Sequence, residues 1–491
     1  MLFNSIEFAL FLPIVFLIYW AIGYAHINDT LKLRLQNAFV VVSSYVFYGW
    51  WDWRFLLLIA FTSFCSWGSG LLIAKSQTPK NAKVWTAANI ALNLAILAVF
   101  KYYDFFVREF GQLFGISTDC LLLRIILPVG ISFYTFQALS YSIDVYRKKI
   151  EPTSDIVAFF AYVAFFPQLV AGPIERATNL LPQFQTNRKF NYDQAVDGMR
   201  QILWGLFKKI VVADNCATYV DQVWATYDTQ TGSTLLLAAI LFTFQIYGDF
   251  SGYSDIAIGT AKLFGIKLMR NFNNPYFSRD IAEFWRRWHI SLTTWFRDYV
   301  YIPLGGSRVG KWKIVRNTFV IFLLSGFWHG ANWTFIAWGA YHALLFLPLI
   351  LLGQNRKYTN QVAEGRILPT WKECGQMLLT FMLAVFGWII FRATGMPSLF
   401  HYLEGMLQWG TLRASYRFFL PDFNLVYPTN MFIIIMLVLE WFGREKEFAL
   451  QEIQRYKVFR KRFVRVVLYA IFLFVILAMR GGAVDFIYFQ F

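Results

Sequence analysis

The stretch Ser325-Gly326-Phe327-Trp328-His329-Gly330-Ala331-Asn332-Trp333 interrupts an apolar run that extends from Thr318 to Leu352. The run is too long for one membrane crossing, which takes about 20 residues. Gly330 and Asn332 are residue types at which helices end and begin, so the pattern predicts two helices with a break directly after His329. Backbone groups freed by a break at membrane depth must be buried in protein or face a wet cavity. The sequence therefore predicts an imidazole beside a polar cavity.

The composition around this stretch is that of a membrane protein. Of the 491 residues, 57% are hydrophobic, 20% are aromatic and only 15% are charged. These values indicate an all-α, polytopic membrane protein, and we expect residues 1–491 to form one domain. The net charge of +16 is typical of cytoplasmic loops facing membrane lipids, so nucleic acid is not expected as a partner.

Eleven apolar stretches fit membrane-embedded helices. They lie near residues 3–23, 36–51, 55–74, 84–107, 155–172, 197–214, 232–247, 317–352, 376–393, 429–443 and 464–480. The first is long enough to be a retained helix rather than a signal peptide. We expect a re-entrant helix pair at 119–150, where Pro and Gly interrupt the pattern, and an extramembrane loop with a short amphipathic helix near 394–430.

The charge pattern gives His329 a depth in the bilayer. Arg308, Lys311, Lys313 and Arg316 form a basic cluster that we place at the cytoplasmic surface. Along a helix, the 13 residues from Arg316 to His329 span roughly 20 Å, which is beyond the middle of a core about 30 Å thick. An ionisable residue there is read as functional by default. We expect His329 to act as a general base, kept neutral by Trp328 and Trp333.

His289 allows two interpretations. It follows Arg286 in a segment from Glu283 to Pro303 that is apolar on one side and charged on the other. It can lie on the polar face of an interfacial helix, or it can orient the acceptor or polarise a carbonyl.

Other polar residues in apolar surroundings favour structural roles. Asp249 and Asp255 follow an apolar run, and we expect them to pair with Arg279, Arg286 or Arg287 rather than to act in catalysis. His342 is expected to pack between helices.

The four cysteines are scattered singly, so neither a metal site nor a tightly bound cofactor is expected. The basic residues after Gly305 and Gly306 allow two interpretations. They can bind the phosphates of a nucleotide-bearing donor, or they can belong to a basic cytoplasmic loop.

Several ordered motifs carry a resemblance to a known family. They are residues 1–5 (MLFNS), 129–137 (VGISFYTFQ), 166–174 (FPQLVAGPI), 249–255 (DFSGYSD), 279–292 (RDIAEFWRRWHISL), 295–306 (WFRDYVYIPLGG), 326–339 (GFWHGANWTFIAWG) and 486–491 (FIYFQF). Together they resemble the membrane-bound O-acyltransferase family, in particular the bacterial branch that modifies alginate and peptidoglycan.

The resemblance implies a ring of tilted helices around a central funnel, with His329 as the catalytic histidine and His289 as the second active-site residue. We expect seven further residues to line the substrate site or to support the histidines: Trp285, Arg286, Trp328, Asn332, Trp333, Asp249 and Asp255.

The implied reaction moves an acyl group, most simply acetyl, from acetyl-CoA, another thioester or an acyl carrier to a hydroxyl outside the bacterial inner membrane. An SGNH-type periplasmic protein is the implied acceptor partner, and the product is an O-acetylated polysaccharide. One alternative is D-alanyl transfer to teichoic acid from a carrier protein. The other is a transporter of an acylated or anionic substrate, which would also bury His and Asp at broken helices.

Overall fold

Helices account for the regular structure of the chain. The computed structural model describes residues 1–170, 172–408, 426–481 and 486–487, and within these ranges it contains helices and no strand. The predicted all-α class is confirmed. The chain groups into two compact units, one formed by residues 1–199 with 257–269 and the other by residues 200–256 with 270–491. The expected single domain and its funnel remain predictions.

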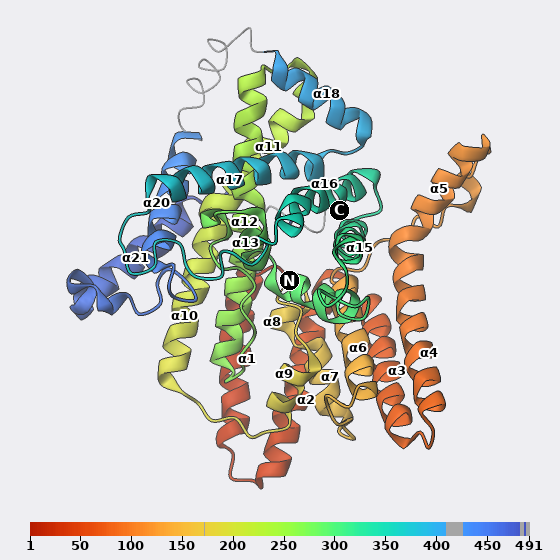
Figure 1. Cartoon of the computed structure of the whole chain (residues 1–491). Helices are drawn as coiled ribbons and strands as arrows, with labels where there is room; N and C mark the ends of the chain where they lie inside the picture. Colours follow the sequence, from red (N-terminus) through yellow and green to blue (C-terminus); the bar gives the residue numbers. More distant parts are fainter. Residues whose placement is uncertain (171, 409–425, 482–485, 488–491) are drawn as a thin grey trace. The chain divides into compact units, whose positions relative to one another are not determined.

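The first unit is built on the amino-terminal helices. Its elements are α1 (Ile6–Tyr24), α2 (Asp29–Asp52), α3 (Phe55–Lys75), α4 (Pro79–Leu97), α5 (Tyr103–Phe114), α6 (Ile131–Tyr146), α7 (Ile156–Ala164), α8 (Phe166–Leu169) and α9 (Ala177–Phe184). A π-helical turn, η1 (Ala98–Tyr102), joins α4 to α5. Helices α3, α4 and α6 lie side by side (Figure 1).

Two helices are divided between the units, and the remaining ones belong to the second. The divided helices are α10 (Tyr192–Leu206) and α12 (Gly232–Leu263). The second unit adds η3 (Phe207–Ala213), α11 (Asp214–Ala225), α13 (Ile281–Arg287), α14 (Ile290–Phe296), η6 (Arg297–Tyr301), α15 (Lys311–His329), α16 (Trp333–Leu351), α17 (Trp371–Arg392), α18 (Met396–Leu407), α20 (Val426–Gly443) and α21 (Arg462–Ala478).

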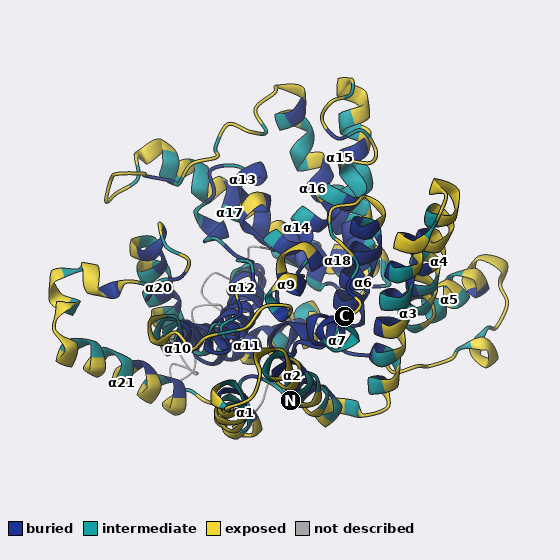
Figure 2. Cartoon of the chain, turned by 90° about the horizontal axis from the view of Figure 1, so that it is seen from below, coloured by how far each residue is buried: buried dark blue, intermediate teal, exposed yellow. Residues whose placement is uncertain are grey.

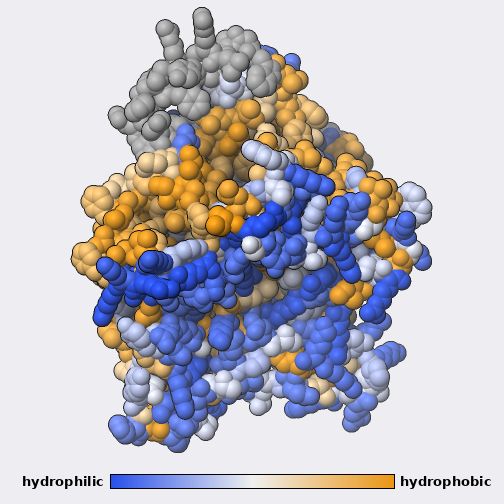
Figure 3. All heavy atoms as spheres, turned by 60° about the vertical axis from the view of Figure 1, so that its left-hand side comes forward, coloured by the Kyte–Doolittle hydropathy of each residue, from blue (hydrophilic) through white to orange (hydrophobic). Residues whose placement is uncertain are grey.

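The helices differ in how far their side chains are buried. In the described residues, six helical segments are long and apolar enough to cross a membrane: 6–24, 55–75, 79–114, 232–263, 333–351 and 371–392. The most apolar part of α12 is 83% buried, whereas that of α1 is 22% buried; Figure 2 shows the same contrast. Large apolar side chains such as Phe463 and Phe474 of α21 are exposed, and apolar atoms gather in a broad area on the face in Figure 3. Such surfaces are expected to face lipid.

Several predicted segments differ from the structure. Residues 155–172 break at Phe165 into α7 and the short α8, so they form no span. The pair expected at 119–150 is one buried helix, α6, which begins directly after Gly130. The only other helical element in these residues is a 3₁₀ turn at Asp119–Leu121. Helix α21 covers the run predicted at 464–480, but with 17 residues it is not among the six candidate spans of the described residues. Of the predicted loop near 394–430, α18 is described, and residues 409–425 lie outside the described ranges.

The predicted break after His329 is confirmed. Helix α15 ends at His329, and α16 begins at Trp333 after an extended Gly330. The two helices then lie side by side. They approach so closely that a Cβ at Gly326 would overlap the carbonyl of Phe335, and one at Gly339 would overlap the carbonyl of Phe322. Glycine at these two contacts sets the spacing of the pair.

We predict that Gly326→Ala destabilises the protein by about 1–3 kcal/mol, because overpacking a tight contact forces the backbones apart. The measurement is the thermal unfolding of the detergent-solubilised protein. Gly375→Ala in α17 is the matched control, since a Cβ there meets no atom within 4 Å and alanine favours helix. Equal melting temperatures for the two variants would contradict the close contact.

Candidate active site

His329 is the last residue of α15, and its side chain is only 4% exposed. Its ring contacts three aromatic rings at nearly perpendicular angles. The centroid distances are 4.9 Å to Trp328, 5.1 Å to Trp338 and 5.3 Å to Phe391. The aromatic surroundings expected for His329 are therefore present, although two of the three rings come from α16 and α17 and were not predicted.

His289 lies at a break between α13 and α14. Its backbone has φ 42° and ψ 55°, in the left-handed region that residues other than glycine seldom adopt. Its side chain is 1% exposed. Of the two interpretations of His289, the one that places it on the polar face of an interfacial helix is therefore wrong. The chain turns at Trp288 and His289, because the backbone of 271–273 bonds to Arg287 and Ile290 on either side of the break. Backbone strain of this kind gathers at functional sites.

One indole connects the two histidines. The Trp328 ring lies 6.2 Å from the His289 ring and 4.9 Å from the His329 ring, measured between centroids. The helix break at His289 and the helix end at His329 thus bring both imidazoles against the same side chain, although 40 positions separate them in the chain.

His342 extends the same cluster. The indole Nε1 of Trp285 donates a hydrogen bond of 3.3 Å to its Nδ1, and the rings of Trp285 and Trp338 each lie 4.9 Å from its ring. Trp338 also contacts His329. The expected helix-packing role of His342 agrees with its burial at 1% exposure.

Two predicted site residues lie at the helix break itself. Asn332 caps α16: its Oδ1 accepts from the N–H of Thr334 at 3.1 Å, and its Nδ2 donates to the carbonyl of Thr394 at 2.8 Å. Trp333 is 51% exposed, and Trp338 occupies the place beside His329 that was expected for it. Asn332 thus fixes the direction of α16.

The partners expected for Asp249 and Asp255 are wrong. Asp249 pairs with Lys209 at 2.8 Å, and Asp255 pairs with Lys208 at 2.6 Å. Arg279 and Arg287 pair with Glu283 instead. The sequence offered a signal for the lysines, since two cations inside an apolar segment are expected to be paired or functional.

These ion pairs organise α12 and the chain end. Lys209 also pairs with Asp214 at 2.8 Å, and Lys208 donates to the hydroxyl of Ser251. Asp249 accepts a hydrogen bond of 2.7 Å from the N–H of Ile487. The acids therefore have structural partners, as the sequence favoured.

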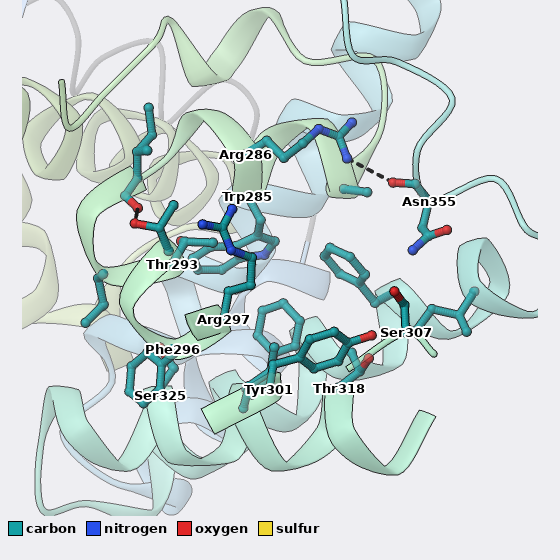
Figure 4. A pocket seen from close by; sticks show the side chains of 18 of the residues that line it. Trp285, Arg286, Thr293, Phe296, Arg297, Tyr301, Ser307, Thr318, Ser325 and Asn355 are labelled. Atoms are coloured by element: carbon teal, nitrogen blue, oxygen red, sulfur yellow. Dashed lines mark hydrogen bonds between the residues drawn. The ribbon is translucent and has the colours of Figure 1, made fainter. Parts of the chain in front are cut away.

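Arg286, by contrast with Arg287, borders a pocket (Figure 4). It donates to the carbonyl of Asn355 at 2.9 Å and to that of Tyr358. The pocket has a volume of about 520 Å³, within the usual range for small ligands. Its lining is mostly apolar, and the residues that line it include Arg286, Arg297, Arg356, Tyr301, Ser307, Thr318 and Ser325. Arg297 is paired with Asp298 at 2.7 Å.

The pocket borders the histidine cluster through two lining residues. Trp285 lines it and bonds to His342. Ser325 lines it and precedes His329 by one helical turn. Neither His289 nor His329 is among the lining residues. This pocket reaches neither imidazole, so the polar cavity expected beside His329 remains a prediction.

Asn271 is a further site residue, and the sequence analysis did not single it out. It is fully buried, and its Oδ1 lies 3.1 Å from Nδ1 of His289. It stands in a run of amides after α12, and only the fold brings that run beside the break at His289.

Both imidazoles are buried at helix breaks of a multi-pass helical protein. Residues 83–374 match the model of the membrane-bound O-acyltransferase family. The chain belongs to that family, and it is an O-acyltransferase; the predicted resemblance is confirmed.

Named relatives cover most of the chain. It is 39% identical over 452 residues to the probable alginate O-acetylase AlgI of Pseudomonas aeruginosa, covering 90% of this chain and 81% of the relative. It is 35% identical over 437 residues to the peptidoglycan O-acetyltransferase of Helicobacter pylori, covering 83% and 80%. The teichoic acid D-alanyltransferase of Bacillus subtilis is more distant, at 28% over 289 residues, covering 56% and 70%.

We predict that Lys209→Met lowers the free energy of unfolding by about 3–5 kcal/mol, because it leaves buried carboxylates without their cation. Equilibrium unfolding in mixed detergent measures the change. Lys32→Met removes a pair whose acid is 75% exposed and is expected to cost less than about 1 kcal/mol. Similar losses for the two variants would show that the Lys209 pairs contribute no more than a surface pair.

Proposed function

We propose that the protein transfers an acetyl group from a cytoplasmic thioester, acetyl-CoA, to a hydroxyl on the outer side of the bacterial inner membrane. The observation that carries the proposal is the contact of one indole, Trp328, with both His289 and His329. Two imidazoles at one buried position provide the acid–base groups that acyl transfer to a hydroxyl needs.

In the proposed reaction, the acceptor oxygen attacks the carbonyl carbon of the thioester while Nε2 or Nδ1 of His329 takes the hydroxyl proton. The tetrahedral intermediate then breaks its C–S bond. The leaving sulfur keeps the electron pair of that bond and takes the proton from His329. The acetyl group has moved from sulfur to oxygen, and His329 is neutral again.

The pocket beside Trp285 is the proposed donor site. Arginine side chains favour phosphate groups, which acetyl-CoA carries, and the pocket presents three of them beside an apolar interior. Ser325 brings the pocket wall to within one turn of His329 on α15. The thioester end is proposed to reach the histidines past the Trp285 indole.

The names of the relatives support the acceptor class. The matches to the two acetylating relatives cover 90% and 83% of this chain, whereas the match to the D-alanyl relative covers 56% of it. Acetylation of an exported polysaccharide is therefore preferred over D-alanyl transfer, and membership of a transferase family replaces the transporter alternative. We also propose that an SGNH-type periplasmic protein receives the acetyl group and passes it to the polysaccharide.

We predict that His329→Ala lowers acetyl transfer by about 100-fold or more, because a general base contributes that much. The purified protein, in lipid discs with its acceptor partner, is incubated with labelled acetyl-CoA, and label on the acceptor is counted. His401→Ala, which changes an exposed histidine on α18, is the control and should retain full activity. Undiminished labelling by a folded His329→Ala protein would refute the proposed base.

We predict that Arg356→Ala raises the KM for acetyl-CoA by about tenfold with kcat nearly unchanged, because a hydrogen bond to a charged group is worth about 1.5–3 kcal/mol. Steady-state transfer at varied donor concentration provides both constants. Lys313→Ala removes the same charge from an exposed position of α15 outside the pocket. A larger effect of Lys313→Ala would show that the donor phosphates bind at the basic cluster that contains Lys313, and not in the pocket.

A further inference from the structure

The imidazole of His289 is held from one side by an amide. Its Nδ1 lies 3.1 Å from Oδ1 of Asn271, and both side chains are buried. The backbone N–H of Ile290 donates to the carbonyl of Asn271 at 2.8 Å, so the two segments are also fastened through the main chain. The ring of Phe250 meets the imidazole nearly at a right angle, with centroids 4.6 Å apart.

The neighbours of Asn271 fix which end of its amide faces His289. The backbone N–H of Ser291 points to the same atom at 3.3 Å, and a backbone N–H can only donate. That atom is therefore the oxygen. The hydroxyl of Ser291 donates to it as well, at 2.9 Å, while Nδ2 donates to the hydroxyl of Ser254 at 3.0 Å.

This orientation decides the tautomer of His289. An amide oxygen accepts only, so Nδ1 of the imidazole must carry the proton and donate it to Asn271. Burial lowers the pKa of His289 to about 3, so the ring is neutral at neutral pH. A neutral ring has one N–H, and the lone pair is therefore on Nε2. Nε2 is buried and has no hydrogen-bond partner among the described residues.

We infer that Asn271 is a positioning residue that locks His289 in the Nδ1–H tautomer, so that Nε2 accepts a hydrogen bond from a second donor group of the acceptor, beside the reacting hydroxyl whose one proton goes to His329. The inference rests on the proposed function. Of the two roles considered for His289, it selects orientation of the acceptor, since a nitrogen without a proton cannot donate to a carbonyl. The left-handed backbone of His289 and the Phe250 contact hold the plane of the imidazole ring, and Asn271 determines that Nδ1 carries the proton.

Three variants separate this role from a packing role. Asn271→Leu has nearly the same size and no acceptor, Asn271→Asp keeps an acceptor oxygen beside Nδ1, and Ser254→Ala removes only the partner of the amide nitrogen. We expect Asn271→Leu to lose about tenfold or more in kcat/KM for the acceptor, with the KM for acetyl-CoA unchanged. Asn271→Asp should restore most of the loss, and Ser254→Ala should differ little from the parent.

Nitrogen NMR of the full chain in lipid discs tests the tautomer without relying on transfer. The chain has five histidines, so ¹⁵N-histidine labelling gives few signals, and His289→Asn identifies the one that belongs to His289. We expect protonated Nδ1 and bare Nε2 in the parent and a changed or mixed pattern in Asn271→Leu.

A protonated Nε2 in the parent would overturn the inference, as would equal losses for the leucine and aspartate variants. If the parent transfers no acetyl group while the expected tautomer is seen, the proposed function fails and the role of Asn271 in fixing the proton stands.

Discussion

The end of α15 at His329 is the constraint on which the rest of the site depends. A helix break inside a membrane protein leaves backbone groups that lipid cannot satisfy. Here the side chain of Asn332 accepts a hydrogen bond from one of them, the N–H of Thr334 at the start of α16. The glycine contacts at 326 and 339 then let α16 return closely along α15. This return places Trp338 on the His329 ring, and Asn332 ties the turn to the residues that follow α17 through Thr394.

The buried charges serve a different purpose from the buried imidazoles. Lys208 lies 2.6 Å from Asp255, and Lys209 lies 2.8 Å from both Asp214 and Asp249, so two cations face three carboxylates. Burial of such pairs contributes little net stability, but the loss of one member is costly. The pairs fix η3 against α12, and α12 in turn presents Phe250 and Ser254 to the segment that carries His289. Stable ionic contacts thus support the segments that surround His289.

Local patterns predicted the all-helical class, the break at Gly330 to Asn332 and the place of His329 at that break, because neighbouring residues determine apolar runs and helix ends. They also favoured ion pairing for Asp249 and Asp255. The partners of these acids, the break at His289 and the amide of Asn271 depend on contacts between residues far apart in the chain. A periodic charge pattern over 283–303 suggested one helix, whereas bonds from residues 271–273 impose the turn. Long-range contacts of this kind leave no local signal.

The indoles around the histidines form an unbroken series of contacts. Trp288 lies 4.7 Å from Trp388, Trp388 lies 6.1 Å from Trp338, and Trp338 lies 5.1 Å from His329. Interlocked flat rings leave little room for independent rotation. A single ring therefore cannot turn without its neighbours, and the proposed passage of the thioester end past the Trp285 indole requires several of these rings to move together.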